Sequence, residues 1–476
     1  MVNDKIPIFL RRLPLGARDF PNHTKWILAS LPLLIGLYSF AIRATGLEDN
    51  FEFDLDQHRD WEMVGVAFAD LPLVGTSQSV GGYNWGPIYY WTLKLIRVIL
   101  GPFFDNLPHS GGIGLSAIQA FSVALITFGL LKRDFPIIGT LAIVILAASS
   151  PKEIGASRSI WNPPLAVSFL YAAIGTWLIW ESKIKDWMVF SIVVMLAWFA
   201  VQAHEPAIFF AASFISTMIL YSFDKDKIFA VFKKGVAAGL IILFLQIPFA
   251  ADYLTHPDKH ASSNHASKSL LMVVTDPAAL AFYGSLTTMN TMVQEILLGG
   301  NCGSFWYMLL GTVFLLGCYV WYHGSQICRQ MLLIAIGSVT LAWIGFSTTN
   351  VIYLHYYETL EIAAILFVAP LLLHWKNSAI AGGLSTVMLL VVILVQPTRI
   401  DQSRHAHSTP AYGRAVRAAK QIIADRVTIR AIEVEGAPFG DFGNAIYRYL
   451  GYGLDRDSVR VARVFKDGHL EYLRRQ

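Results

Sequence analysis

Cysteine and charge are both scarce in this chain of 476 residues. The three cysteines have no metal-ligand spacing, which excludes a disulfide framework and a structural zinc site (Cys302, Cys318 and Cys328). Lys, Arg, Asp and Glu make up only 15% of the residues, well below the share in a typical soluble domain. The sequence has no P-loop, no GxGxxG after a strand, no HExxH, no nucleophile elbow and no basic aromatic module for nucleic acid. These absences argue against nucleotide-binding, zinc-protease, serine-hydrolase and nucleic-acid-binding classes.

Long apolar runs dominate instead. Hydrophobic residues make up 55% of the chain, and the mean hydropathy is +0.50. Apolar runs recur along the chain, and their length is close to the ~20 residues that cross a bilayer. The first run is too long for a cleavable signal peptide and lacks a small-residue cleavage site. We therefore predict an all-α polytopic membrane protein with about eleven transmembrane helices. The predicted spans are 26–45, 111–131, 137–150, 162–180, 187–203, 205–222, 235–251, 304–322, 331–347, 356–373 and 379–396.

Lysine and arginine in the connections predict the orientation, because cytoplasmic loops carry the excess of these residues. The N-terminal arm and alternate connections are basic, so we place the N-terminus in the cytoplasm. The outer side then holds the loops 46–110 and 252–303 and the tail 397–476. The predicted organisation is a transmembrane domain, 1–396, followed by a small soluble domain, 397–476.

The outer segments differ in character. Loop 46–110 is too long for a plain connector and contains helix-like stretches near 57–70 and 87–100. The second stretch is amphipathic and predicts a helix in the membrane interface, with its tyrosines and tryptophan at headgroup depth. Segment 252–303 is predicted to be a mobile cover. Tail 397–476 is polar and arginine-rich, and its pattern predicts a small α/β appendage. Its helix-like parts are 411–425 and 441–452, and its strand-like parts are 428–435 and 459–465.

Carboxylates are concentrated directly behind the first hydrophobic segment. Such a cluster gains nothing for membrane insertion or packing, so it suggests a site for protons, cations or a polar substrate. The alternative is a solvated turn that caps a helix. The acids are Glu48, Asp49, Glu52, Asp54, Asp56, Asp60 and Glu62.

Four sequence segments carry a family resemblance. They are FDLDQHRDW (53–61), GGYNWGPIYYWTLKL (81–95), ASRSIWNPPLAVSFLYAAIGTWLI (156–179) and YLHYYETLEIAAILF (353–367). Together they resemble the glycosyltransferase family 39 type of the GT-C membrane glycosyltransferases, which includes bacterial relatives of protein O-mannosyltransferases and the lipid A aminoarabinose transferase. The resemblance covers most of 26–396 and is weak in the tail. It implies a bacterial inner-membrane enzyme that moves a sugar from a polyprenyl-phosphate carrier to an acceptor on the periplasmic face.

The implied chemistry needs a carboxylate. Glycosyl transfer passes through an oxocarbenium-like transition state, and the acceptor hydroxyl must lose its proton to a base. Family members carry an Asp followed by Glu or Gln after the first span, and Asp56-Gln57 matches that position. The resemblance therefore implies Asp56 as general base, with Asp54 as its rival, and inversion at the sugar carbon.

The leaving phosphate needs positive charge or hydrogen-bond donors. Arg158 suits this role because a guanidinium matches two phosphate oxygens at once, although an arginine that only anchors a helix end is the alternative. Arg59 fits the same role, or it pairs with a neighbouring acid. His204, and His355 with Tyr356, lie at the outer ends of predicted spans and are expected to contact substrate or phosphate.

The segment around Asn84-Trp85 departs from the family pattern. Many members carry His or Glu-Lys immediately before the Gly-Pro or Pro-Pro step, so a second carboxylate that could bind metal is missing here. We predict no metal ligand and no required cofactor, and no clear motif supports a divalent cation. Tyr83, Asn84, Trp85 and Asn162 are predicted to line the substrate pocket, with an interfacial aromatic belt as the alternative.

Two other functions stay open. A proton- or cation-coupled transporter would use the acids and His204, but transporters bind substrate at mid-membrane between repeats, and no repeat is evident. The second is an inactive GT-C scaffold, because Asn84-Trp85 replaces residues that many family members carry at that place. The favoured prediction is transfer of a hexosyl or pentosyl group from undecaprenyl phosphate to lipid A, an envelope glycan or a protein hydroxyl. The expected partners are the lipid-linked sugar, membrane lipid and that acceptor, with no nucleic acid.

Overall fold

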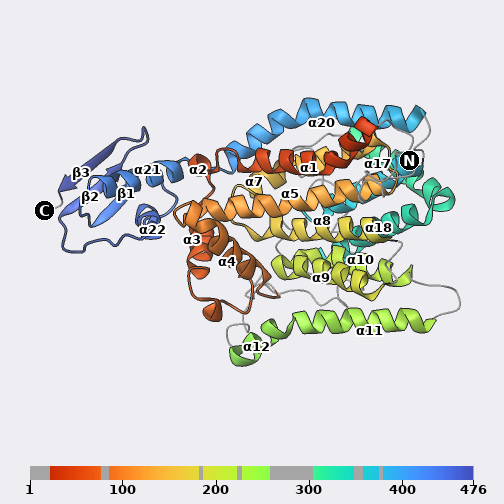
Figure 1. The fold of residues 1–476 in the computed structure, drawn as a ribbon, viewed down its shortest axis with the longest axis horizontal. Helices are drawn as coiled ribbons and strands as arrows, with labels where there is room; N and C mark the ends of the chain where they lie inside the picture. The colour runs from red at the N-terminus through yellow and green to blue at the C-terminus, as the bar shows by residue number, and fades with distance from the viewer. Residues whose placement is uncertain are drawn as a thin grey trace, which may run out of the picture.

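The computed structural model describes residues 22–76, 85–181, 186–221, 228–257, 304–347, 358–374 and 379–474. Long helices lie side by side in an elongated bundle, and a small sheet projects from one end of it (Figure 1). The bundle helices are α1 (Asn22–Ala44), α5 (His109–Lys132), α6 (Ile137–Ala148), α8 (Asn162–Trp180), α9 (Trp187–Ala203), α10 (Ile208–Leu220), α11 (Ile228–Leu245), α17 (Ser304–His323), α18 (Gln326–Phe346), α19 (Leu360–His374) and α20 (Ala379–Ala406).

Each predicted span overlaps one of these helices, so the hydropathy pattern located the helices correctly. By length and apolarity, four helices in the described ranges can cross a membrane: Ser30–Asn50, His109–Lys132, Asn162–Trp180 and Gln326–Phe346. The count rises to five if α11 and α12 (Ile247–Thr255), which meet at a bend of 48°, form one broken span. The mostly helical architecture with several apolar helices of membrane-spanning length is confirmed, whereas the count of eleven spans stays a prediction.

Helix α8 lies at the centre of the bundle, and nearly all of its side chains are buried. Small residues let α5 approach it closely. A Cβ on Gly175 would lie 2.8 Å from the Leu125 backbone, and one on Gly129 would lie 2.6 Å from Leu178. In a membrane, such backbone contact is a main source of helix association, because lipid tails are as apolar as leucine. Helices α5 and α8 therefore form a tightly packed support for the loops at their ends.

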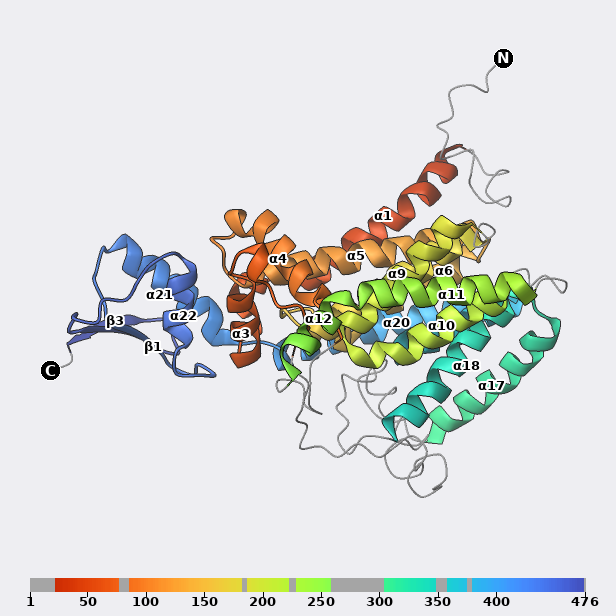
Figure 2. The same ribbon diagram turned by 90° about the horizontal axis from the view of Figure 1, so that it is seen from below.

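Short helices gather at the end of the bundle from which the sheet projects, here called the loop end (Figures 1 and 2). Helix α3 ends at Met63, well before the predicted limit at residue 70. The chain turns at Gly65, where a Cβ would lie 2.9 Å from the Glu62 carbonyl oxygen and 3.1 Å from an Arg97 guanidinium nitrogen, so the turn after α3 is closely packed. The short helices here are α2 (Leu47–Asn50), α3 (Leu55–Met63), α4 (Ile88–Leu100), α7 (Pro151–Ala156) and the 3-10 turns Phe68–Asp70, Gly101–Phe103 and Glu205–Ala207.

A buried polar chain crosses the bundle near the loop end. The Arg43 side chain on α1 is fully buried and donates from Nε to Gln119 Oε1 on α5 at 2.9 Å. Gln119 Nε2 in turn donates to Glu153 Oε2 on α7 at 3.1 Å. On α19, Glu361 Oε1 accepts a hydrogen bond from Tyr171 at 2.9 Å. Burying an ionisable group is costly, and these hydrogen bonds offset part of that cost while connecting α1, α5 and α7, and α8 with α19.

The last part of the chain forms a small α/β unit, residues 410–474, here called the C-terminal unit. Its sheet has the order β1-β2-β3, in which β1 and β2 are parallel and β2 and β3 are antiparallel. The helices coincide with the predicted helix-like stretches, and the third strand was not predicted. The elements are α21 (Pro410–Ala424), β1 (Ala431–Val434), α22 (Phe442–Tyr449), β2 (Arg460–Val464) and β3 (Leu470–Arg474).

The predicted boundary between the two domains falls inside a helix. Helix α20 continues through Pro397 and ends only at Ala406. Its last turns are polar. Hydropathy predicts that the span ends where the polar residues begin, whereas in the structure these residues continue the helix. Arg404 in this extension donates to the Ile42 carbonyl of α1, so the extension is attached to the bundle. The C-terminal unit therefore begins about a dozen residues later than the sequence suggested.

Candidate active site at the loop end

Helix α3 begins with a capping box. Asp54 is the N-cap residue, and its Oδ1 accepts a hydrogen bond from the Asp56 amide at 3.0 Å. The Gln57 side chain reaches back and accepts from the Asp54 amide at 3.1 Å. These bonds satisfy backbone donors that the first turn would otherwise leave unpaired. The predicted rival base thus fixes the start of the helix, which places Asp56 in its first turn.

Removing the cap should cost stability locally. We expect Asp54→Ala to lower the free energy of unfolding by about 0.5–2 kcal/mol, whereas Asp54→Asn, which still caps, should stay near wild type. Denaturant titration with hydrogen exchange over residues 55–63 measures both. Loss of activity in Asp54→Asn as severe as that in Asp56→Asn would show that Asp54 has a chemical role beyond capping.

One face of α3 carries a row of alternating charges. Arg59 Nη1 lies 3.0 Å from Asp56 Oδ1, and Arg59 Nε lies 2.9 Å from Asp60 Oδ1. The Asp56 side chain is 64% exposed, whereas that of Asp60 is 3% exposed. Burial alone would lower the pKa of Arg59, but the Asp60 carboxylate raises it above its ordinary value. Asp60 therefore anchors a charged guanidinium against the exposed Asp56.

Two tyrosines of α4 complete the surroundings of Asp60. The hydroxyls of Tyr89 and Tyr90 each lie 3.0 Å from an Asp60 carboxylate oxygen. Burial raises the pKa of Asp60, while Arg59 and the two phenols act in the opposite direction. The Tyr89 hydroxyl is also 2.7 Å from the Ile160 carbonyl, and its single hydrogen can serve only one acceptor at a time. This hydroxyl joins α3 to the turn before α8.

Two sequence-based interpretations are wrong at this point. The alternative of a solvated turn for the acidic cluster fails at Asp60, which is buried. Tyr89 and Tyr90 were expected at headgroup depth, but both are buried against Asp60, while Trp91 is 41% exposed. A periodicity signal existed, since residues 56, 59 and 60 share one face of a helix. Spacing within α3 does not reveal which residues of α4 meet that face.

Arg158 lies against the end of α1. Its Nη1 donates to the Thr45 carbonyl at 3.0 Å, and its Nη2 donates to the Gly46 carbonyl at 3.1 Å. The side chain is buried, and burial, assisted by the charge of Arg404, lowers its pKa to about 10. Gly46 has a φ of 71°, the left-handed conformation that ends many helices, so the guanidinium satisfies exposed helix-end carbonyls. Arg158 has a feature of each predicted role. Its two hydrogen bonds to Thr45 and Gly46 fit an arginine that anchors a helix end, and its buried position at the loop end fits phosphate binding.

Three further predicted residues lie at the adjoining ends of α8 and α9. Asn162 Nδ2 donates to the Ala203 carbonyl at 2.9 Å and lies 3.3 Å from His204 Nδ1. Both side chains are buried. The Trp85 ring packs against Trp198, with ring centroids 6.4 Å apart. The structure thus brings Asn162 and His204 together. Asn162 follows Ile160, whose carbonyl Tyr89 contacts, by two residues.

The remaining predicted residues, Tyr83, Asn84, His355 and Tyr356, lie outside the described residues. Within the part of the chain that the structure describes, no group of three or more His, Cys, Asp or Glu side chains could hold a metal ion. The Asp56 carboxylate and the Arg59 guanidinium offer acid–base and hydrogen-bonding chemistry at this end of the bundle.

The chain is similar to known proteins in its three-dimensional structure but not detectably in its sequence. No protein-family model matches the sequence. No curated protein sequence matches it either. Among solved structures, the chain is similar to the archaeal oligosaccharyltransferase AglB from Archaeoglobus fulgidus, in complex with an inhibitory peptide and a dolichol-phosphate. The TM-score is 0.51 at 11% sequence identity, over 90% of this chain, which spans only 64% of AglB.

The chain is also similar to ArnT from Cupriavidus metallidurans. The apo structure gives a TM-score of 0.51 at 11% identity, and the structure bound to undecaprenyl phosphate gives 0.50 at 12% identity. Each comparison covers 91% of this chain and 86% of ArnT. Identities this low establish similarity of fold, and both neighbours are GT-C superfamily membrane transferases. The resemblance seen in the sequence is therefore confirmed at the level of architecture, and the chain has the GT-C fold.

Proposed function

We propose that this protein transfers a sugar from a polyprenyl-phosphate donor, such as undecaprenyl phosphate, to an envelope acceptor. The exposed Asp56 carboxylate, held beside Arg59 by the buried Asp60, carries the proposal. The GT-C fold supports it, because one neighbour is bound to undecaprenyl phosphate and the other to a dolichol-phosphate and a peptide. The acceptor is lipid A, an envelope glycan or a protein hydroxyl.

In the proposed reaction, Asp56 takes the proton of the acceptor hydroxyl while the acceptor oxygen attacks the anomeric carbon. The bond between that carbon and the phosphate oxygen breaks, and the polyprenyl phosphate leaves with the electron pair. Because negative charge grows on the phosphate, nearby donors stabilise the transition state. Arg59 is the best placed of these, with Arg158 and His204 as the other candidates. A single base on one side of the sugar favours inversion.

The choice of Asp56 over Asp54 rests on what each carboxylate already does. Asp54 accepts the Asp56 amide hydrogen and caps α3, so a bound acceptor would compete with that bond. Among the described residues, the Asp56 carboxylate contacts Arg59 alone, and its side chain is largely exposed, which leaves room for a hydroxyl. Positively charged Arg59 next to the base also places a guanidinium within reach of a donor phosphate.

We place this site on the periplasmic face of a bacterial inner membrane, with residues 46–110 as the catalytic loop of a transmembrane domain and the C-terminal unit on the same side. The predicted cover, 252–303, lies for the most part outside the described residues. The donor's polyprenyl tail would lie beside α4, whose outward residues Leu95 and Ile99 are exposed and apolar.

Purified protein in lipid nanodiscs provides the test. We expect it to move labelled sugar from synthetic undecaprenyl-phosphate sugars to a component of an envelope extract. Solute counterflow across proteoliposomes without any glycosylated product would overturn the proposal in favour of a transporter. Absence of both activities would favour a scaffold.

A further inference from the structure

The catalytic helix α3 has a second face, which is held by the C-terminal unit. Successive residues of a helix turn by about 100°, so His58 and Glu62 lie about 160° and 120° around the helix from Asp56. The Tyr449 hydroxyl, at the end of α22, lies 2.6 Å from His58 Nδ1. The face that carries the proposed base is therefore backed by a part of the chain nearly 400 residues away.

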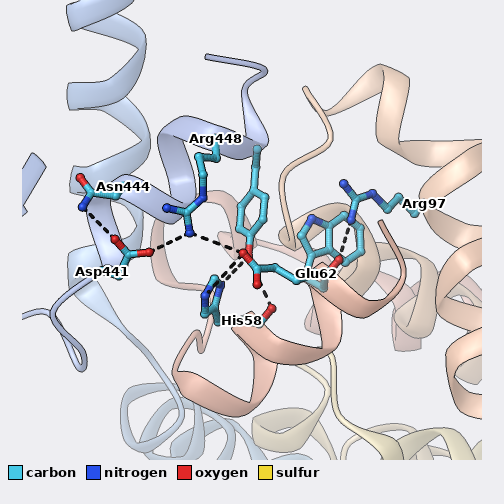
Figure 3. A network of polar contacts seen from close by, with 8 residues as sticks. His58, Glu62, Arg97, Asp441, Asn444 and Arg448 are labelled. Atoms are coloured by element: carbon cyan, nitrogen blue, oxygen red, sulfur yellow. Dashed lines mark hydrogen bonds and ion pairs between the residues drawn. The ribbon is translucent and has the colours of Figure 1, made fainter. Parts of the chain in front are cut away.

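An ion-pair chain extends this contact. Glu62 Oε1 lies 3.5 Å from Arg448 Nη2, and Arg448 Nη2 lies 2.7 Å from Asp441 Oδ2 (Figure 3). Burial alone would raise the pKa of Asp441, but hydrogen bonds from Arg448 and Asn444 lower it below its ordinary value. Asp441 stays charged and fixes the orientation of Arg448, so the guanidinium that reaches α3 is itself held in place.

Aromatic packing accompanies these polar contacts. The His58 ring stacks on Phe439 with centroids 5.2 Å apart and an angle of 22° between the ring planes. Phe53, just before α3, is fully buried and packs edge-on against Phe442 at 5.5 Å. Burial of this kind restricts both the position and the rotation of the helix start.

The other side of α3 is held by α4. The Arg97 guanidinium lies over the Trp61 ring at 4.8 Å and donates to the Trp61 carbonyl. Together with the Tyr89 and Tyr90 contacts to Asp60, this places α3 between two supports, α4 and the C-terminal unit. A helix of nine residues is too short to be stable alone, so its orientation depends on these neighbours.

We propose that Tyr449 and Arg448 are positioning residues for sugar transfer: they hold the face of α3 that carries His58 and Glu62, so that Asp56 and Arg59 keep a productive orientation. This inference rests on the proposed function. A base displaced by a fraction of an ångström transfers protons less efficiently, and a displaced Arg59 stabilises less well the charge that grows on the leaving phosphate in the transition state. The C-terminal unit thus acts on the rate of the chemical step without contacting the substrate.

Single side-chain changes test this role. Tyr449→Phe keeps the ring and removes the hydroxyl, and Arg448→Gln removes the charge. We expect each to lower kcat by about 3–10-fold, the effect of losing one or two hydrogen bonds, with KM for the donor unchanged. Arg448→Lys keeps the charge and should recover part of the loss. Hydrogen exchange over 55–63 should become faster in both impaired variants.

Arg417→Gln is the matched control. Arg417 also lies in the C-terminal unit, but its ion pair is with Asp49 on α2, and both side chains are at least 60% exposed. We expect its kcat to stay within about 2-fold of wild type, with no change in exchange over 55–63. An equal loss in this variant would indicate that any disturbance of the C-terminal unit lowers activity, and would overturn the specific role of Tyr449 and Arg448.

Two other outcomes would also overturn the inference. Unchanged kcat and unchanged exchange in Tyr449→Phe and Arg448→Gln, with an active wild type, would show that α3 does not depend on them. A raised KM for the acceptor at constant kcat would instead assign Tyr449 to substrate binding, in the cavity of about 560 Å³ that it lines with Lys420 and Tyr452. Absence of transfer by the wild type would refute the proposed function itself, which is a distinguishable result.

Discussion

Replacing Asp56 with asparagine should lower the rate of sugar transfer by about 10²–10⁴-fold, which corresponds to roughly 3–5 kcal/mol in the activation barrier. The amide has nearly the same shape as the carboxylate but cannot accept the acceptor's proton. Because the Asp56 side chain is 64% exposed, the change should leave the fold intact. Initial rates with a labelled polyprenyl-phosphate sugar measure the effect, and thermal unfolding checks the fold.

Glu48→Gln is a suitable control for this substitution. Glu48 lies in the same acidic loop, on α2, and its side chain is 65% exposed, but it lies outside the row formed by Asp56, Arg59 and Asp60. We expect its rate to remain within about 2-fold of wild type. If Asp56→Asn kept full activity, Asp56 would be excluded as the base, and a comparable loss in Glu48→Gln would mean that the loop's overall charge matters more than one carboxylate.

Replacing Arg43 with methionine should destabilise the protein by about 3–5 kcal/mol, the typical cost of removing one partner from a buried charged network. Methionine fills much of the same volume but leaves Gln119 Oε1 without its donor and removes the positive charge that interacts with Glu153. Titration with a denaturing detergent, followed by circular dichroism, measures the change in the free energy of unfolding.

The exposed Arg329 near the start of α18 provides the control, since Arg329→Met should change stability by less than about 0.5 kcal/mol. Adding Glu153→Gln to Arg43→Met should restore part of the lost stability, because the neutral glutamine amide, unlike the Glu153 carboxylate, does not need the missing positive charge. A loss below about 1 kcal/mol for Arg43→Met would contradict a structural role for the network.

Most of the helices could be predicted from the sequence because an apolar run long enough to cross a bilayer produces a strong local signal. That signal fails at α20, whose polar last turns extend ten residues beyond the predicted span, to Ala406. The pattern near 57–70 also overestimates α3, which ends at Met63. Contacts with another segment lie at both helix ends: Arg404 of α20 donates to the Ile42 carbonyl of α1, and Gly65, just after α3, lies beside Arg97.

The candidate site was predictable only in part for a similar reason. Asp54 and Asp56 were found because they follow the first hydrophobic segment within a recognisable motif. The partners of Asp60 are 29 and 30 residues away on α4, and the Tyr449 that reaches His58 is 391 residues away. Contacts at such separations follow from the packing of whole helices, and one sequence carries no local pattern for them.

Conversion of the lipid carrier is the most direct measurement of the proposed chemistry. Phosphorus NMR distinguishes the phosphodiester of a sugar-charged polyprenyl phosphate from the phosphomonoester that remains after transfer. With the wild-type protein in nanodiscs and an envelope extract as acceptor source, we predict that the monoester appears in proportion to the glycosylated product, and that Asp56→Asn nearly abolishes it. A phosphodiester signal that stays unchanged with the wild-type protein would contradict the proposed glycosyl transfer.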